Sequence, residues 1–258
     1  MHEDPISPTG AAARPVMMIT GASRGIGAAI ARAASLTHDV VLNYASSADA
    51  AELLAGELRE RGCAVLVHRA DVGDEAAIGG MFAAADEHFG RLDVVVNNAG
   101  MAGGYGGIGT VTGEMLERLW RVNVTSAFVC CREAARRMST RAGGGGGSIV
   151  TISSKAAVLG GPNEWVHYAA SKGALDTMTI GLSKELALDG IRVNAVRPGL
   201  IESDFHLAAT AGRVERMTPT VPMQRSGSPA EVAAAVIWLA SPAASYVTGA
   251  FIDVTGGR

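Results

Sequence analysis

Short apolar runs rich in valine and isoleucine alternate with alanine-rich stretches along the chain. The runs are apolar at consecutive positions, which is typical of strands that are buried on both faces of a parallel sheet. The alternation predicts an α/β fold in which helices cover both faces of a doubly wound sheet. Seven strands are expected, at residues 16–20, 39–44, 64–69, 92–97, 148–153, 191–196 and 250–254.

The stretches between these strands have the periodicity of helices. Residues 168–188 contain no proline, and Leu175, Met178, Leu182 and Leu186 recur at intervals of three or four residues. This spacing places apolar side chains along one face of a helix. Six helices are expected, at residues 25–37, 48–61, 75–89, 113–138, 168–188 and 229–239.

Two connections differ from ordinary short loops. Five consecutive glycines at 143–147 lie between a helix and a strand, and they predict a flexible surface connection. Residues 202–228 carry two prolines and mixed charges, and the segment is too long for an ordinary connector, so we expect a lid there. Its large side chains include Phe205, Leu207, Arg213, Arg216 and Met217.

Length and composition indicate one soluble domain. Residues 1–14 mix acids, prolines and small residues, so we expect a loose extension there and a single domain over 15–258. The net charge of −3 does not favour nucleic acid or a membrane surface as a partner. No apolar run approaches the roughly 20 residues that cross a bilayer. The three cysteines form no paired framework, which fits a reducing compartment, so we expect a cytoplasmic protein, and we expect no metal site.

A glycine-rich turn follows the first expected strand. The sequence TGASRGIG places Gly21, Gly25 and Gly27 between that strand and an alanine-rich helix. Glycines at such a turn let the backbone approach a pyrophosphate, and the free N–H groups of the new helix favour its charge. The strand–turn–helix context is the one that a dinucleotide site requires.

The motifs that follow this turn resemble those of the classical short-chain dehydrogenase/reductases. In chain order they are Ala-Asp-Val at 70–72, NNAG at 97–100, Asn123 in VNVTS, serines 153 and 154, YAASK at 168–172, and RPGLIES at 197–203. The resemblance extends from residue 16 to the C-terminus, where VTGAFIDVTGG is similar to the family's closing strand. It implies a single Rossmann-type domain and an NAD(P)-dependent oxidoreductase that acts on CH–OH groups.

The resemblance implies Tyr168 as general acid/base, Lys172 as its partner, Ser154 as the residue that holds the carbonyl oxygen, and Asn123 as the anchor of a water relay. The spacing of Tyr168 and Lys172 places both on one helix face, one turn apart. A free phenol has a pKa near 10, so nearby positive charge is needed to favour the phenolate. Ser153 competes with Ser154, which follows the apolar strand residues and better matches the family.

The end of the second expected strand bears on the choice of cofactor. An acid there would bind the adenosine ribose and repel a 2′-phosphate, but the sequence LNYASSADA has no acid before Asp49. Arg24 and either Ser46 or Ser47 could bind that phosphate, so NADP is favoured. In the alternative, Arg24 pairs with a surface acid and NAD is also used. The cofactor residues implied are Gly21, Ser23, Arg24, Gly25, Ile26, Gly27, Asn43, Tyr44, Ser46, Asp71, Val72, Asn97, Ala99, Gly100, Tyr168, Lys172, Pro198, Gly199 and Ile201.

The sequence does not select a substrate beyond a small carbonyl compound or secondary alcohol. Similar sequences include 3-oxoacyl carrier-protein reductases and sugar or alcohol dehydrogenases. An acidic carrier protein would suit the arginines at 132, 136, 137 and 141, although a solvated helix face explains them equally. Trp165 and Glu164 precede Tyr168 and are candidates for the pocket wall. His167 points about 100° away from Tyr168 around the helix and is expected to be a wall residue or a surface group. A sensor that binds the dinucleotide without turnover is the rival, but it need not retain the set of catalytic side chains.

Small residues form a second stripe on the expected helix at 168–188. They are Ala170, Gly173, Ala174, Thr177 and Gly181. The stripe would allow another helix to approach closely, and the resemblance implies a homodimer or homotetramer that pairs through this helix. In the alternative, the stripe packs onto the protein's own sheet.

Overall fold

The computed structural model describes residues 14–202 and 212–258. Its strands form one parallel sheet in the order β3-β2-β1-β4-β5-β6-β7, which confirms the predicted doubly wound α/β fold. The chain reverses its direction of winding between β1 and β4, and ligands of such sheets bind where this reversal opens a crevice. The strands are β1 (Val16–Ile19), β2 (Asp39–Tyr44), β3 (Val65–Arg69), β4 (Val94–Asn97), β5 (Gly147–Ile152), β6 (Ile191–Pro198) and β7 (Phe251–Val254).

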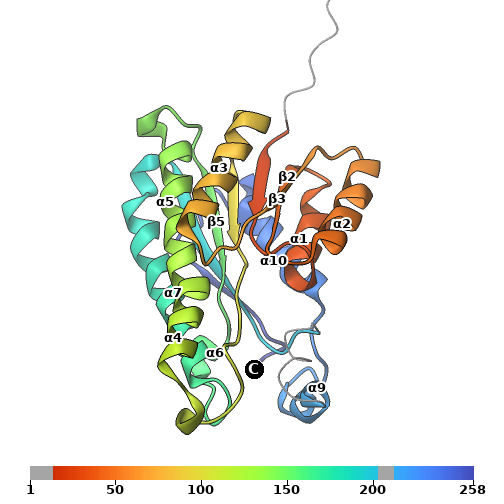
Figure 1. The fold of residues 1–258 in the computed structure, drawn as a ribbon, viewed down its shortest axis with the longest axis vertical. Helices are drawn as coiled ribbons and strands as arrows, with labels where there is room; N and C mark the ends of the chain where they lie inside the picture. The colour runs from red at the N-terminus through yellow and green to blue at the C-terminus, as the bar shows by residue number, and fades with distance from the viewer. Residues whose placement is uncertain (1–13, 203–211) are drawn as a thin grey trace, which may run out of the picture.

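Helices cover both faces of this sheet (Figure 1). Alternate residues of β1 point to opposite faces, so Met17 and Ile19 belong to one apolar core while Val16 and Met18 belong to the other. The first core is closed by α1 (Gly25–Ala34), α2 (Ala48–Glu60) and α10 (Pro229–Ala240). The second is closed by α3 (Glu75–Phe89), α5 (Ser126–Met138) and α7 (Val166–Glu185).

The expected helix at 113–138 is interrupted, which corrects the prediction. It consists of α4 (Gly113–Trp120), a π-helical turn (Arg121–Thr125) and α5. The wide turn carries the buried Asn123, whose amide hydrogen-bonds the backbone of Met101. An irregularity of this kind is often found at a functional site, and no pattern of apolar residues reveals it.

The glycine run at 143–147 packs closely against the end of α5, which the sequence did not indicate. The N–H of Gly144 donates to Ser139 O (2.8 Å), and the N–H of Gly146 donates to Met138 O (2.7 Å). A β-carbon at Gly144 would collide with the carbonyl oxygen of Arg137. Glycine is therefore required by the close approach of two backbone segments.

The stripe of small residues on α7 faces away from the sheet, so the alternative that it packs onto its own sheet is wrong. Ala170 and Thr177 are exposed, and a β-carbon at Gly173 or Gly181 would contact nothing within 4 Å. None of the helices in the described residues is both long and apolar enough to cross a membrane.

The four arginines considered for carrier-protein docking all pair with acids of the same chain. Arg132 binds Glu75, Arg136 and Arg137 bind Glu133, and Arg141 lies 3.8 Å from Asp189. These pairs favour the interpretation of a solvated helix face over a docking surface.

Candidate functional site

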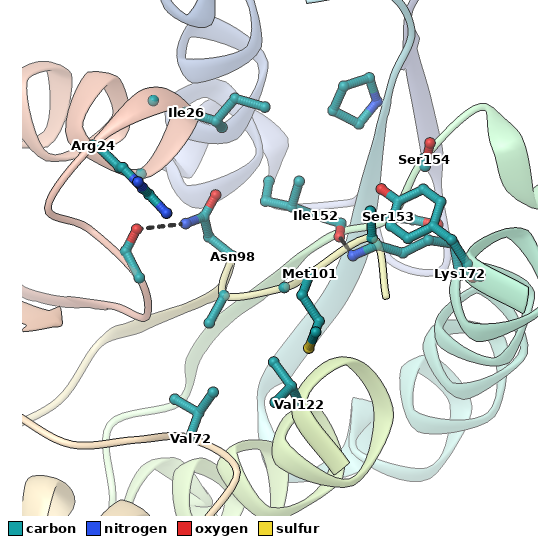
Figure 2. Close-up of a pocket in the computed structure, with 18 of the residues that line it drawn as sticks. Arg24, Ile26, Val72, Asn98, Met101, Val122, Ile152, Ser153, Ser154 and Lys172 are labelled. Atoms are coloured by element: carbon teal, nitrogen blue, oxygen red, sulfur yellow. Dashed lines mark hydrogen bonds between the residues drawn. The ribbon is translucent and has the colours of Figure 1, made fainter. Parts of the chain in front are cut away.

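A cavity of about 1060 Å³ opens at the carboxyl ends of the parallel strands. All but three of the predicted site residues line it, and they come from the ends of six strands and the helices that follow. Figure 2 shows Arg24 and Ile26 at one end of this cavity and Ser154 and Lys172 at the other. We call these the glycine-turn end and the Tyr168 end.

The glycine-turn end is formed by the loop between β1 and α1. Arg24 occupies the position before α1, and no side chain caps the first turn of that helix. The free N–H groups and the positive end of the helix dipole therefore favour an anion in the cavity. A β-carbon at Gly27 would lie 2.6 Å from the side-chain nitrogen of Asn98, so the approach of α1 to this loop requires glycine.

Asn43 and Asn97 do not line the cavity, in contrast to the prediction. Asn43 is buried behind the glycine turn, where its Oδ1 accepts from Gly21 N (3.1 Å) and its Nδ2 donates to Ala70 O (3.0 Å). Asn97 points to the opposite side and donates to Cys131 Sγ. Both amide side chains lie behind the cavity wall and hold it in place, and neither is part of its lining.

Asn98, rather than the preceding Asn97, lines the cavity. Its Nδ2 donates to the carbonyl oxygens of Thr20 (2.8 Å) and Gly21 (3.0 Å), which ties the fourth strand's end to the glycine turn. The NNAG motif contained the signal for this residue, because the two asparagines of an extended segment face opposite sides.

The segment that follows β2 lines the glycine-turn end and contains no acid, whereas Arg24 and Arg69 line the same cavity. Tyr44, Ser46 and Ser47 follow β2 along the wall, and Arg69 at the end of β3 was not predicted. Arg24 is exposed and forms no ion pair with any acid in the part of the chain that the structure describes. The structure therefore does not show the alternative in which Arg24 pairs with a surface acid.

At the other end, the phenol of Tyr168 lies against Ser154. Tyr168 is 8% exposed, and its burial raises the pKa to about 12, although a hydrogen bond with Ser154 opposes the rise. The hydroxyl of Ser153 instead donates to Asp176 Oδ1 (2.6 Å). This arrangement favours Ser154 over Ser153 as the partner of the phenol.

Lys172 lies beneath the Tyr168 ring on the same helix. Its Nζ is 5.7 Å from the ring centroid and donates to Ile152 O (2.8 Å), the bond drawn in Figure 2. Burial lowers the pKa of Lys172 to about 8, while the negative charge of Asp176 opposes this fall. A positive charge is thus held one helical turn from the phenol.

Asn123 lies behind the loop that contains Gly100 and Met101 and does not line the cavity. Its Oδ1 accepts from Met101 N (2.8 Å), and its Nδ2 donates to Met101 O (2.9 Å) and Ser171 Oγ (3.0 Å). A β-carbon at Gly100 would lie 3.4 Å from Asn123 Oδ1 and 3.5 Å from Lys172 Nζ. Asn123 thus fixes the loop beside Lys172, and its role in a water relay stays a prediction.

Aromatic and charged side chains close the Tyr168 end. The ring of Trp165 packs edge-on against Tyr168, with 6.0 Å between centroids. Arg213 lies over the Trp165 ring and binds Glu164 (2.7 Å). Arg258 lines the same region and was not predicted. Of the expected lid residues, Phe205 and Leu207 lie outside the described residues.

His167 was considered as a wall or surface residue. It is buried but is not part of the cavity lining, and neither ring nitrogen has a hydrogen-bond partner among the residues that the structure describes. It packs instead near Gly103. The side chain is therefore not placed to act on a ligand in the cavity.

Comparison with known proteins gives matches along nearly the whole chain. A family model described as enoyl-(acyl carrier protein) reductase matches residues 21–258. The uncharacterized oxidoreductase YgfF of Escherichia coli strain K12 is 46% identical over 245 residues, which cover 94% of this chain and 99% of that protein. Versicolorin reductase stcU of Emericella nidulans is 39% identical over 255 residues, which cover 94% of each chain.

A solved structure agrees with these sequence matches. The short-chain dehydrogenase from Burkholderia cenocepacia J2315, in complex with NADP, has a TM-score of 0.87 at 32% identity, covering 95% of this chain and 97% of that one. Both the order of the strands and the motifs around the cavity fit this likeness. The chain belongs to the classical short-chain dehydrogenase/reductase family and is an oxidoreductase of that family.

Proposed function

We propose that the protein transfers a hydride between NADP(H) and a carbonyl compound or the corresponding secondary alcohol, with Tyr168 as the general acid/base. The observation that carries the proposal is the contact of the Tyr168 phenol with Ser154, above the buried ammonium group of Lys172. A sensor would not need an acid, a charged partner and an oxygen-binding hydroxyl in one place.

The residues at the glycine-turn end fit a phosphorylated dinucleotide. The backbone at Gly21–Gly27 and the uncapped start of α1 suit the pyrophosphate. Arg24, Ser46 and Arg69 line the cavity and would suit the ribose 2′-phosphate, and no acid at the end of β2 would repel it. The complex of the Burkholderia relative with NADP supports this choice, and NAD is the less favoured alternative.

The cofactor supplies the hydride when bound, and the chain's own residues manage the proton. With its pKa raised to about 12, Tyr168 is a neutral phenol near pH 7 and can donate its proton to the oxygen of a carbonyl that is being reduced. Ser154 donates a hydrogen bond to the same oxygen as negative charge develops there. Lys172, whose pKa is about 8, is charged near pH 7 and stabilises the phenolate that is left.

The experiment that tests this mechanism replaces Tyr168 with phenylalanine. General acid catalysis contributes about 10²- to 10⁴-fold in rate, so we expect Tyr168→Phe to lose turnover by at least about 10²-fold. The binding of NADPH, followed by its fluorescence, should be retained. Tyr246→Phe is the matched control, because Tyr246 is fully exposed on the surface.

Turnover is measured with NADPH and NADH in parallel, on ketones, diketones, acetoacetyl thioesters and aldoses. A kcat of Tyr168→Phe close to that of the wild type would exclude the mechanism. If wild-type protein binds NADPH but reduces none of these compounds, a sensor becomes the better interpretation. The panel also distinguishes a sugar dehydrogenase from a ketoacyl or carbonyl reductase.

We also propose that two copies of the chain associate through α7. The small-residue stripe of this helix faces outward, because a β-carbon at Gly173 or Gly181 would meet nothing within 4 Å. Large apolar side chains lie exposed on the same helix and on α4 and α5, namely Trp120, Phe128 and Ile180. Small residues beside exposed apolar ones are typical of a surface on which another helix packs.

A further inference from the structure

The Tyr168 end of the cavity contains a guanidinium group that is held rigidly. Arg213 is 6% exposed, its Nη2 lies 2.7 Å from Glu164 Oε2, and its Cζ lies 4.3 Å from the centroid of the Trp165 ring. Glu164 also accepts a hydrogen bond from the hydroxyl of Tyr105 (3.2 Å). Because Trp165 packs against Tyr168, this cluster lies beside the phenol that acts on the substrate.

Arg258 brings a second guanidinium group to the same place. Its side chain lines the cavity and is partly buried, and it has no hydrogen bond or ion pair with any of the residues that the structure describes. Burial lowers the pKa of Arg258, and so does the charge of Arg213, while Glu164 opposes them. In the described residues, Glu164 is thus engaged by Arg213, and the charge of Arg258 has no acid of its own.

Arg258 lies at the Tyr168 end of the cavity, close enough to Arg213 and Glu164 for their charges to act on it. Arg258 follows β7, whose neighbour Thr255 packs against Gly199 at the Tyr168 end of the cavity. The residues suited to the pyrophosphate and the 2′-phosphate, such as Arg24, lie at the glycine-turn end, as Figure 2 shows for Arg24. The ligand of Arg258 is therefore expected to be the substrate.

We propose that Arg258 is an anion-binding residue of the substrate site, and that the preferred substrate is a carbonyl compound with a carboxylate group. The carbonyl oxygen lies at Ser154 and Tyr168, and the carboxylate binds the guanidinium group of Arg258. Arginine suits this task because its planar group can bind both oxygens of a carboxylate at once. Arg213 does not bind the carboxylate itself; it is held by Glu164 and Trp165, and it neutralises Glu164 so that this acid does not compete for Arg258. The inference rests on the proposed reductase activity.

The test compares oxo acids with their methyl esters, which have the same carbonyl group without the charge. Acetoacetate and benzoylformate are assayed against methyl acetoacetate and methyl benzoylformate with NADPH. Wild-type enzyme should give a higher kcat/KM for each acid than for its ester. A hydrogen bond to a charged group contributes about 1.5–3 kcal/mol, so Arg258→Gln should raise KM for the acids by about 10- to 100-fold.

The split between KM and kcat identifies the role of Arg258. The variant should keep its kcat for the acids within about threefold, and its KM for the esters should not change, since the residue binds the carboxylate in both ground and transition states. Arg141→Gln, on the surface, is the matched control. If the esters are preferred by the wild type, or if Arg258→Gln affects acids and esters equally, the carboxylate site does not exist.

A binding measurement separates failure of this inference from failure of the proposed function. Calorimetry with enzyme saturated with NADP⁺ measures the affinity for acetoacetate and benzoylformate without any reaction. Tighter binding of these acids than of their esters, lost in Arg258→Gln, supports the anion site even if none of them is reduced. Reduction of the esters without any such difference would leave the reductase function intact and overturn the anion site. No binding of either acid would overturn it too.

Discussion

Replacing Lys172 with methionine should change the pH dependence of stability as well as activity. Lys172 is 3% exposed and lies between the Tyr168 ring and the carbonyl oxygen of Ile152. Burial lowers the pKa of the amine from 10.5 to about 8, and only the charge of Asp176 opposes it. A depressed pKa means that the folded protein is destabilised when the amine is charged.

The size of this effect follows from the two pKa values. One pKa unit corresponds to about 1.4 kcal/mol, so the fall from 10.5 to about 8 corresponds to roughly 3 kcal/mol. Below pH 8 the amine is charged in both states, and the folded state bears the full cost of burying the charge. Between pH 8 and pH 10.5 the unfolded chain binds a proton that the folded chain does not, so stability rises with pH.

Urea unfolding of cofactor-free protein, followed by circular dichroism from about pH 7 to about pH 10, measures this effect. The free energy of unfolding of the wild type minus that of Lys172→Met should rise by about 2–3 kcal/mol over this range. Lys184→Met, exposed on the same helix, should show no such rise. Loss of the bond to Ile152 shifts the difference by a constant amount. A difference that stays flat, or falls with pH, would refute the reasoning.

Two further variants test the serine assignment and the assembly. Ser154→Ala should lower kcat by about 10²- to 10³-fold, as loss of a hydrogen-bond donor to the reacting oxygen does. Ser153→Ala should lower kcat far less. Steady-state kinetics that show the reverse order would assign the role to Ser153. Gly173→Arg should convert the oligomer to a monomer, as measured by light scattering. Gly56→Arg on α2 is the control and should leave the mass unchanged, since a β-carbon there also meets nothing within 4 Å. A monomeric wild type, or a Gly173→Arg variant of unchanged mass, would contradict pairing through α7.

The parts of the site that could be predicted are local in sequence. The glycine turn is recognisable because a strand, a turn and a helix follow one another without interruption from β1 to α1. Tyr168 and Lys172 are recognisable from the resemblance to the family, and helical geometry places residues four apart on one face. The absence of an acid after β2 could likewise be recognised from the sequence, since the residue after a parallel strand faces the ligand crevice.

The errors concern residues whose environment is made by distant segments. Asn43 lies in a segment expected to bind the cofactor, yet its amide is hydrogen-bonded to the backbone of Gly21 and Ala70 behind the cavity wall. The run at 143–147 resembles a flexible linker, yet the backbone of Arg137 passes so close that Gly144 has no room for a side chain. The neighbours that decide such roles lie on other elements, so no local pattern contains them.

The amino-acid sequence by itself determined the layered α/β architecture and the placement of Tyr168 and Lys172 on one helix face, because these depend on periodicity and short-range spacing. The preference for Ser154 over Ser153 came from the sequence, and the tertiary structure added the hydrogen bond of Ser154 with the phenol and that of Ser153 with Asp176. The tertiary structure alone decided that Lys172 is buried enough to lower its pKa to about 8. It also decided that Arg258, which follows β7, joins Arg213 at the Tyr168 end of the cavity. Burial and charge pairing depend on which segments meet in space, and that is settled only when the whole sheet is assembled.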